Sequence, residues 1–173
     1  MIRGSPNPRY FGLPARLKKA RKQSGLTRKG VVQKVGGDQS AMRDIETNQR
    51  LPTVGTVARL ASALHVSAAW VGFGLGNPEL DGPPATCEGM GSRLETVRCE
   101  RGLTKAALAR LIQVTPRAVA AIESGGQARI QTVEALAQAL GISPAWLAFN
   151  QGPRVLPRTR RGGPVAQSSA TVG

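Results

Sequence analysis

The chain has 173 residues, with 24 lysine and arginine side chains against 10 aspartate and glutamate side chains, and a net charge of +14. This excess of positive charge favours a polyanionic partner such as nucleic acid or an anionic membrane surface. Two cysteines and one histidine are too few for a disulfide framework or a zinc site, so we expect no metal and no other cofactor.

Residues 1–12, MIRGSPNPRYFG, predict a basic N-terminal arm. They lack the apolar core of a secretory signal, and no run in the chain approaches the roughly 20 apolar residues that span a bilayer. We therefore expect a cytoplasmic protein with no membrane segment. Arg3 and Arg9 of this arm are candidates for phosphate or minor-groove contacts, and a solubilising role is an equally open alternative.

Two long stretches of the chain repeat each other. Residues 16–46 align without a gap with residues 93–123, and LASALHVSAAW at 60–70 matches LAQALGISPAW at 136–146 in seven of eleven positions. In the first stretch the identical residues are Arg16/Arg93, Leu17/Leu94, Arg21/Arg98, Gly25/Gly102, Leu26/Leu103, Thr27/Thr104, Ala41/Ala118, Ile45/Ile122 and Glu46/Glu123. A repeat of this length predicts a duplicated domain of about 60 residues.

Each copy predicts five short helices. The first ends at Gly25 or Gly102, where glycine suits the left-handed residue after a helix. The predicted N-caps of the second, third and fifth helices are Thr27, Asp38 and Ser67 in one copy and Thr104, Thr115 and Ser143 in the other. Apolar residues recur at helical spacing in the fourth helix, and Trp70 and Trp146 of the fifth are expected to pack in a core or an interface.

Two short helices joined by a tight turn, the second polar on its outer face, indicate a helix-turn-helix. With LTRKGVVQKVGGDQSAMRDIE and LASALHVSAAW, the chain resembles the Cro/CI-type, or XRE-family, DNA-binding domain of phage repressors, twice. The resemblance implies an all-α fold of two tandem five-helix domains. The expected organisation is arm 1–12, domain 13–73, Gly/Pro-rich linker 74–90, domain 91–150 and a basic disordered tail 151–173.

The resemblance also implies which residues meet DNA. The third helix is expected in the major groove, where glutamine suits adenine, arginine suits guanine and aspartate accepts from cytosine. The base-reading residues of the first copy would be Gln39, Ser40, Arg43 and Asp44. Asp44 has an alternative role, an ion pair with Arg43 or another basic residue. The phosphate contacts would come from Thr27, Arg28 and Lys29 at the start of the second helix and from Asn48 and Arg50 after the third.

The second copy offers a poorer DNA-reading face. Its corresponding outer positions are Pro116, Arg117, Ala120 and Ala121, of which only Arg117 suits base readout, with Thr104, Lys105 and Thr115 at the phosphate positions. The copies also depart from the family pattern in complementary ways. The family has a small residue in the second helix, where that helix approaches the third; the first copy has Val32 there and the second has Ala109. The family's turn glycine is Gly36 in the first copy and is replaced by Gln113 in the second. Unequal DNA affinity of the two copies follows.

Linker and tail set how the two copies would be used. Seventeen linker residues reach at most about 56 Å extended and about 23 Å as a flexible coil, enough for one chain to occupy two major grooves about 34 Å apart. Such a site would have unlike half-sites, whereas binding to perfect palindromes would indicate a homodimer reading through one copy. The tail, with four arginines and no acid, would track phosphates or serve solubility only.

The predicted function is sequence-specific binding of double-stranded DNA by a cytoplasmic, nucleoid-associated transcriptional regulator, with repression favoured over activation. The alternative is an antitoxin or anti-activator in which the second copy binds a protein partner through its alanine-rich third helix. An enzyme is disfavoured because no set of side chains suited to catalysis stands out.

Overall fold

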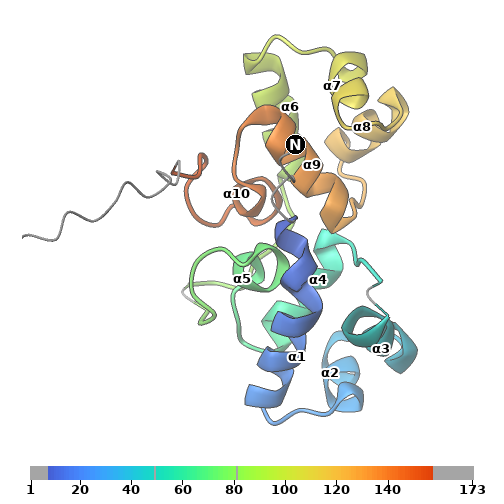
Figure 1. The fold of residues 1–173 in the computed structure, drawn as a ribbon, viewed down its shortest axis with the longest axis vertical. Helices are drawn as coiled ribbons and strands as arrows, with labels where there is room; N and C mark the ends of the chain where they lie inside the picture. The colour runs from blue at the N-terminus through green and yellow to red at the C-terminus, as the bar shows by residue number, and fades with distance from the viewer. Residues whose placement is uncertain (1–7, 49, 81, 158–173) are drawn as a thin grey trace, which may run out of the picture.

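The computed structural model describes residues 8–48, 50–80 and 82–157, and within these ranges every regular element is a helix. The described residues form ten α-helices, and Figure 1 shows that the molecule is elongated. The elements are η1 (Arg9–Gly12), α1 (Leu13–Gln23), α2 (Arg28–Val35), α3 (Gln39–Thr47), α4 (Val54–Ala63), α5 (Ala68–Phe73), α6 (Met90–Glu100), α7 (Lys105–Leu111), α8 (Pro116–Glu123), α9 (Ile130–Leu140) and α10 (Pro144–Phe149). We call α1–α5 the first unit and α6–α10 the second unit. The all-α prediction is confirmed.

The helix starts follow from local side-chain chemistry. A β-region residue precedes most helices, and its hydroxyl or carboxylate accepts a backbone N–H that the helix itself leaves without a partner. All six predicted capping residues do this: Thr27, Asp38, Ser67, Thr104, Thr115 and Ser143. Gly25 and Gly102 take positive φ just after α1 and α6, as predicted for a helix end.

An arginine at the same place in each unit joins the first helix to the last. Arg16 of α1 donates to the carbonyls of Val71 (2.9 Å) and Gly72 (3.0 Å) in α5. Its equivalent, Arg93 of α6, donates to Leu147 and Ala148 of α10. Because the last carbonyls of a helix lack partners within the helix, these guanidinium groups close each unit.

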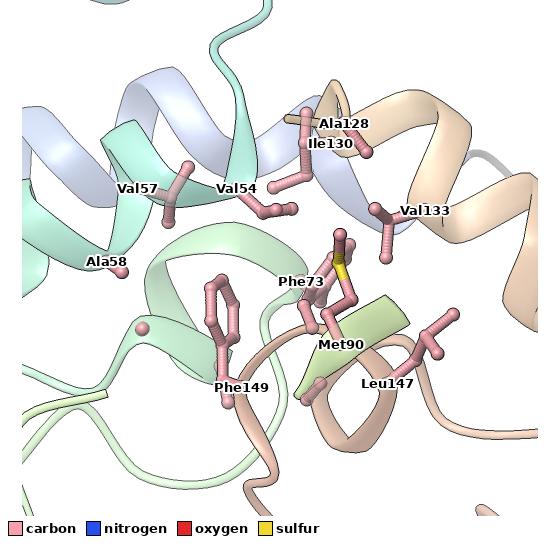
Figure 2. Close-up of a cluster of buried hydrophobic side chains, with 14 of the residues drawn as sticks. Val54, Val57, Ala58, Phe73, Met90, Ala128, Ile130, Val133, Leu147 and Phe149 are labelled. Atoms are coloured by element: carbon pink, nitrogen blue, oxygen red, sulfur yellow. The ribbon is translucent and has the colours of Figure 1, made fainter. Parts of the chain in front are cut away.

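The two units share one hydrophobic core. Figure 2 shows Val54, Val57 and Phe73 of the first unit among Ile130, Val133, Leu147 and Phe149 of the second. Helices α5 and α10 pack against each other, and Val54 and Ile130 each lie almost fully out of solvent. In addition to the linker, a buried interface joins the two copies, which the sequence pattern did not predict.

The segment between the units, predicted as a linker, has no helix in its described residues before α6 begins at Met90. It is nevertheless attached to the first unit. The N–H of Ser67 donates to the carbonyl of Pro78 (2.9 Å), and Val66 and Glu79 form an antiparallel bridge. The linker is therefore held, at Pro78 and Glu79, against the turn between α4 and α5.

Both ends of the described chain have partners in the second unit. Residues 9–12 of the predicted arm form η1, whose backbone donates to Glu134 of α9. Residues 151–157 of the predicted disordered tail are held in place as well. The carbonyl of Arg154 accepts from Ser143 N, its guanidinium pairs with Glu100, and it lies 5.2 Å from the ring centre of Trp146. Composition alone missed these partners. Arg3 and residues 158–173 lie outside the described residues.

Both tryptophans lie where the sequence placed them. Trp70 and Trp146 are half-buried at the edge of the core. Within the described ranges, no helix combines the length and the hydropathy needed to cross a bilayer.

Candidate nucleic-acid interface

Helices α2 and α3 and a three-residue turn form the helix-turn-helix of the first unit. Gly36 adopts φ 70°, ψ 149° and Gly37 φ 129°, which are backbone conformations that favour glycine strongly. Two consecutive glycines therefore let the chain turn sharply before Asp38 caps α3.

The outer face of α3 exposes polar side chains near the N-terminus of the helix. Met42 and Ile45 are buried on the inner face, while Gln39, Ser40 and Arg43 are exposed. We call Gln39, Ser40, Arg43 and Asp44 the first recognition face. Hydrogen bonds from the hydroxyl and the N–H of Ser40 lower the pKa of the Asp38 carboxyl. Ser40 thus serves the helix cap as well as the face.

Asp44 contacts both residues that the sequence predicted as phosphate contacts after α3, Asn48 and Arg50. Its carboxylate accepts from Asn48 Nδ2 (2.8 Å) and lies 3.7 Å from Arg50 Nη1. The alternative role considered for Asp44, an ion pair with a basic residue, is the one the structure displays, with Arg50 as the partner. The structure brings Asp44, Asn48 and Arg50 together at the C-terminal end of the face.

The start of α2 presents the other predicted phosphate-contacting residues. Thr27 Oγ1 accepts from Gly30 N (3.1 Å) as the helix cap, and its own hydroxyl proton stays available to an acceptor. Lys29 is exposed. Arg28 is half-buried, and its Nε donates to Glu46 Oε2 (2.7 Å). Its guanidinium is therefore partly exposed and forms an ion pair with Glu46.

Glu46 is the centre of a buried cage that the sequence analysis did not assign. Its side chain is 0% exposed, and it accepts from Arg21 Nε (2.7 Å) and from Nη2 (3.2 Å). Burial opposes ionisation of Glu46, but the hydrogen bonds and charges of Arg21 and Arg28 outweigh burial and lower its pKa. Since Arg21 belongs to α1, Arg28 to α2 and Glu46 to α3, the cage fixes α3 against α1 and α2.

The second unit repeats this cage. Glu123 accepts from Arg98 Nε (2.6 Å) and lies 3.3 Å from Lys105 Nζ. The hydrogen bond with Glu123 raises the pKa of Arg98 above its ordinary value, against the opposing effect of burial. The recurrence of Arg21 and Glu46 as Arg98 and Glu123 was the sequence signal for both cages. Lys105, predicted at phosphate, occupies the position of Arg28.

Helices α7 and α8 form the second helix-turn-helix with a sparser outer face. Gln113 takes positive φ (57°) in the turn, Thr115 caps α8, and Thr104 caps α7 by accepting from Ala107 N (3.0 Å). Arg117 and Ala121 are exposed. We call Pro116, Arg117, Ala120 and Ala121 the second recognition face. It differs from the first in having a single charged group.

Helices α3 and α8 lie on one side of the molecule. In Figure 1, α3 and α8 are both on the right, α3 in the lower half and α8 in the upper half, while α5 and α10 lie on the left, near the middle. An elongated surface with one helix-turn-helix near each end results. In the part of the chain that the structure describes, no group of three or more histidine, cysteine or acidic side chains is arranged to hold a metal ion.

Two protein-family models match the chain. One, described as "Helix-turn-helix domain", matches residues 13–70, and the other, described as "Helix-turn-helix", matches residues 94–147. No curated protein and no solved structure matches the chain. The first match runs from α1 into α5 and the second from within α6 into α10, so each unit has its own match.

Proposed function

The chain belongs to the Cro/CI-type (XRE) helix-turn-helix family and is a DNA-binding regulator, and we propose that it represses transcription by reading the major groove with α3 and, more weakly, α8. The observation that best supports this proposal is the set of side chains on the first recognition face. Exposed Gln39 and Arg43 suit adenine and guanine edges. Residues suited to phosphate flank them at both ends, with Thr27 and Lys29 at the start of α2 and with Asn48 and Arg50 after α3, where both contact the Asp44 carboxylate.

In this proposal the phosphate contacts position the protein and the base contacts give specificity. Arg28, Lys29 and Arg50 in the first unit and Thr104, Lys105 and Thr115 in the second contribute mainly charge or hydrogen bonds to the DNA backbone. Affinity therefore falls steeply as salt rises, through release of counterions. The protein acts in the cytoplasm on the nucleoid, and covering a promoter accounts for repression.

A gel-shift series tests base readout. The probes are a preferred site, selected from random DNA or from the region upstream of the protein's own gene, and a scrambled site. Arg43→Ala is expected to lose discrimination between these probes, because the guanidinium reads a base. Arg59→Ala is the matched control, since Arg59 is an exposed arginine of α4 outside the recognition face. Equal loss in both variants, or unchanged discrimination in Arg43→Ala, would reject the assignment of α3.

A second candidate function rests on the surface around α8. Leu111, the last residue of α7, is 59% exposed, where the first unit has Lys34. In the following helix, α8, the second recognition face carries the exposed Ala121. An apolar surface of this kind suits a protein partner, as an antitoxin or anti-activator would need. Leu111→Lys should abolish capture of such a partner and leave DNA binding intact. Weakened DNA binding with no captured partner would reject this function.

A further inference from the structure

The contact between the units joins each position to its own repeat equivalent. Thr53 and Arg129 form an antiparallel bridge, and in this stretch the copies are offset by 76 residues, so the two residues hold the same place in their units. Val54 N donates to the carbonyl of Ala128 (2.9 Å), and Ile130 N donates to that of Pro52 (3.0 Å). Exchanging the two copies turns one hydrogen bond into the other. This is the pattern of a two-fold axis, in which a patch meets itself.

The apolar side of the interface has the same symmetry. The rings of Phe73 and Phe149, again equivalent residues, lie 6.1 Å apart. Figure 2 shows both members of the pairs Val54 and Ile130, and Phe73 and Phe149, in one cluster. The interface thus repeats the two-fold relation in side chains as well as in the backbone.

Burial shows that this relation is fixed and is not one of many positions of two tethered units. Val54, Ile130, Phe73 and Phe149 are all buried and contribute to the single core. Separating the units would expose all four to water, which the hydrophobic effect opposes. The distance and angle between α3 and α8 are therefore set by the interface.

The interface also departs from symmetry at two points that favour pairing within one chain. Glu134 is buried and accepts from the N–H groups of Arg9 (2.8 Å) and Tyr10 (3.2 Å), while its equivalent in the first unit is Ala58. Gln151 Oε1 accepts from Ala69 N (3.1 Å), and its equivalent is Leu75. Two copies of the first unit could not make either contact. These two contacts therefore favour pairing of the two different units over pairing of two copies of one unit.

Resting on the proposed function, we propose that a single chain binds, as a monomer, one inverted pair of unlike half-sites at one fixed spacing. A two-fold axis gives α3 and α8 the inverted relation that paired helix-turn-helix units need for two half-sites on one side of the duplex. The half-sites are unlike because the first recognition face carries Gln39 and Arg43 whereas the second carries Arg117 beside alanines. The interface through which a second chain would complete such a pair is occupied within the chain.

The test uses the full chain and its preferred site, selected from random DNA, in four forms. These are the selected arrangement, the weaker half-site reversed into a direct repeat, the two half-sites separated by five further base pairs, and the stronger half-site alone. Two linked contacts exceed one by about a hundredfold or more, so the direct repeat and the widened site should fall to the affinity of the single half-site. Mass measurement of the complex should give one chain per duplex.

Four outcomes would overturn the inference. Equal affinity for the direct repeat or for the widened site would mean two independently tethered units. Two chains per duplex on a symmetrised site would mean a homodimer reading through one unit. Selection that yields no preferred sequence would reject the proposed function itself, and with it this inference. Selection that yields preferred half-sites in no fixed relative orientation would reject this inference alone.

A linker variant provides the second measurement without disturbing the core. Residues 82–84 are exposed, so five glycine and serine residues inserted after Gly82 lengthen the connection and leave the interface intact. If the interface sets the spacing, the ratio of affinities for the selected and widened sites stays within about twofold of the parent. If the linker sets it, the longer, flexible connection broadens the accepted spacings, and that result would overturn the inference.

Discussion

Glu46 in the first unit and Glu123 in the second each accept from an arginine of the first helix of their unit, and each forms an ion pair with a basic residue at the start of the second helix. Their recognition faces have no such agreement. Gln39, Ser40 and Asp44 of the first are matched by Pro116, Arg117 and Ala121 of the second. Residues that hold three helices together are therefore retained between the copies, and residues whose side chains point to solvent have diverged. The units share a support and differ in what they present.

The largest effect should come from opening a cage. Glu46→Ala leaves the mostly buried Arg21 without its partner, which costs about 4 kcal/mol of unfolding free energy, and Glu123→Ala should cost a similar amount through Arg98. Urea denaturation measures both. Glu95→Ala is the control, because Glu95 is more than half exposed and its carboxylate lies as far as 3.9 Å from Arg98. This variant should lose less than about 1 kcal/mol of unfolding free energy. A large difference between the Glu46 and Glu123 variants would mean that the two supports are not equivalent.

The cage also gives the first unit a pH dependence. The pKa of folded Glu46 lies below its ordinary value of 4.5, so the unfolded chain binds more protons in the acid range. The stabilisation is complete above the ordinary pKa and is lost as the pH falls through the lowered, folded-state pKa. Denaturation midpoints between pH 7 and pH 3 should therefore fall, and Glu46→Gln should flatten this fall. An equally steep fall in the variant would contradict the assignment.

Next in size is a steric difference between the units. A Cβ atom on Gly91 of α6 would lie 2.7 Å from the carbonyl oxygen of Ile122 and would also meet that of Glu123. Gly91→Ala should destabilise the protein by about 3 kcal/mol, because backbone must shift to admit the methyl group. The first unit has Pro14 at the equivalent place, and Pro14→Ala should change stability by less than about 1 kcal/mol. Calorimetry on both variants decides whether close packing of α6 on α8 is peculiar to the second unit.

The recognition faces should differ in DNA affinity. Arg43→Ala is expected to cost about 2 kcal/mol, roughly thirtyfold, on the preferred half-site of α3. Arg117→Ala should act on the other half-site and cost less, since fewer neighbouring groups fix its position. Titrations against probes with one half-site scrambled separate the two effects. If either variant lost affinity equally on both half-sites, the one-face-per-half-site assignment would be wrong.

The smallest expected effect lies in the turns. Gln113 has φ 57°, a conformation that costs a residue with a side chain about 1 kcal/mol, so Gln113→Gly should stabilise the protein by about that amount. The reverse change, Gly36→Gln, should destabilise by about 2 kcal/mol, because φ 70° with ψ 149° is essentially restricted to glycine. Thermal denaturation measures both. A destabilised Gln113→Gly variant would show that the side chain, and not the backbone, governs this turn.

Local chemistry made most of the fold predictable from the sequence. Helix caps depend on the capping residue and the next three residues, so Thr27, Thr115 and Ser143 could be assigned from neighbours alone. Comparison of the two copies then distinguished residues that hold the helices together, which recur, from exposed residues of the third helix, which differ. The DNA contacts of Gln39, Arg43 and Arg117 stay predictions, although the structure places all three on exposed helix faces.

The interface between the units could not be predicted in this way. Val54 and Phe73 have the spacing of buried residues, but periodicity does not say whether the neighbour belongs to the same unit or to the other. Glu134 was harder still, because its partners are backbone N–H groups about 125 positions earlier in the chain. A buried acid in an apolar stripe was the only available signal, and it does not identify its donors.

The contact of Glu134 with Arg9 and Tyr10 also has a consequence for synthesis of the protein. At about 5–20 residues per second, the N–H groups of η1 emerge from the ribosome roughly ten seconds before the carboxylate that will accept them. Val54 and Phe73 likewise stay without their partners in the second unit until Ile130 and Phe149 have been synthesised. The first unit therefore remains incomplete throughout most of translation, and its final docking belongs to the moment when α9 and α10 are released.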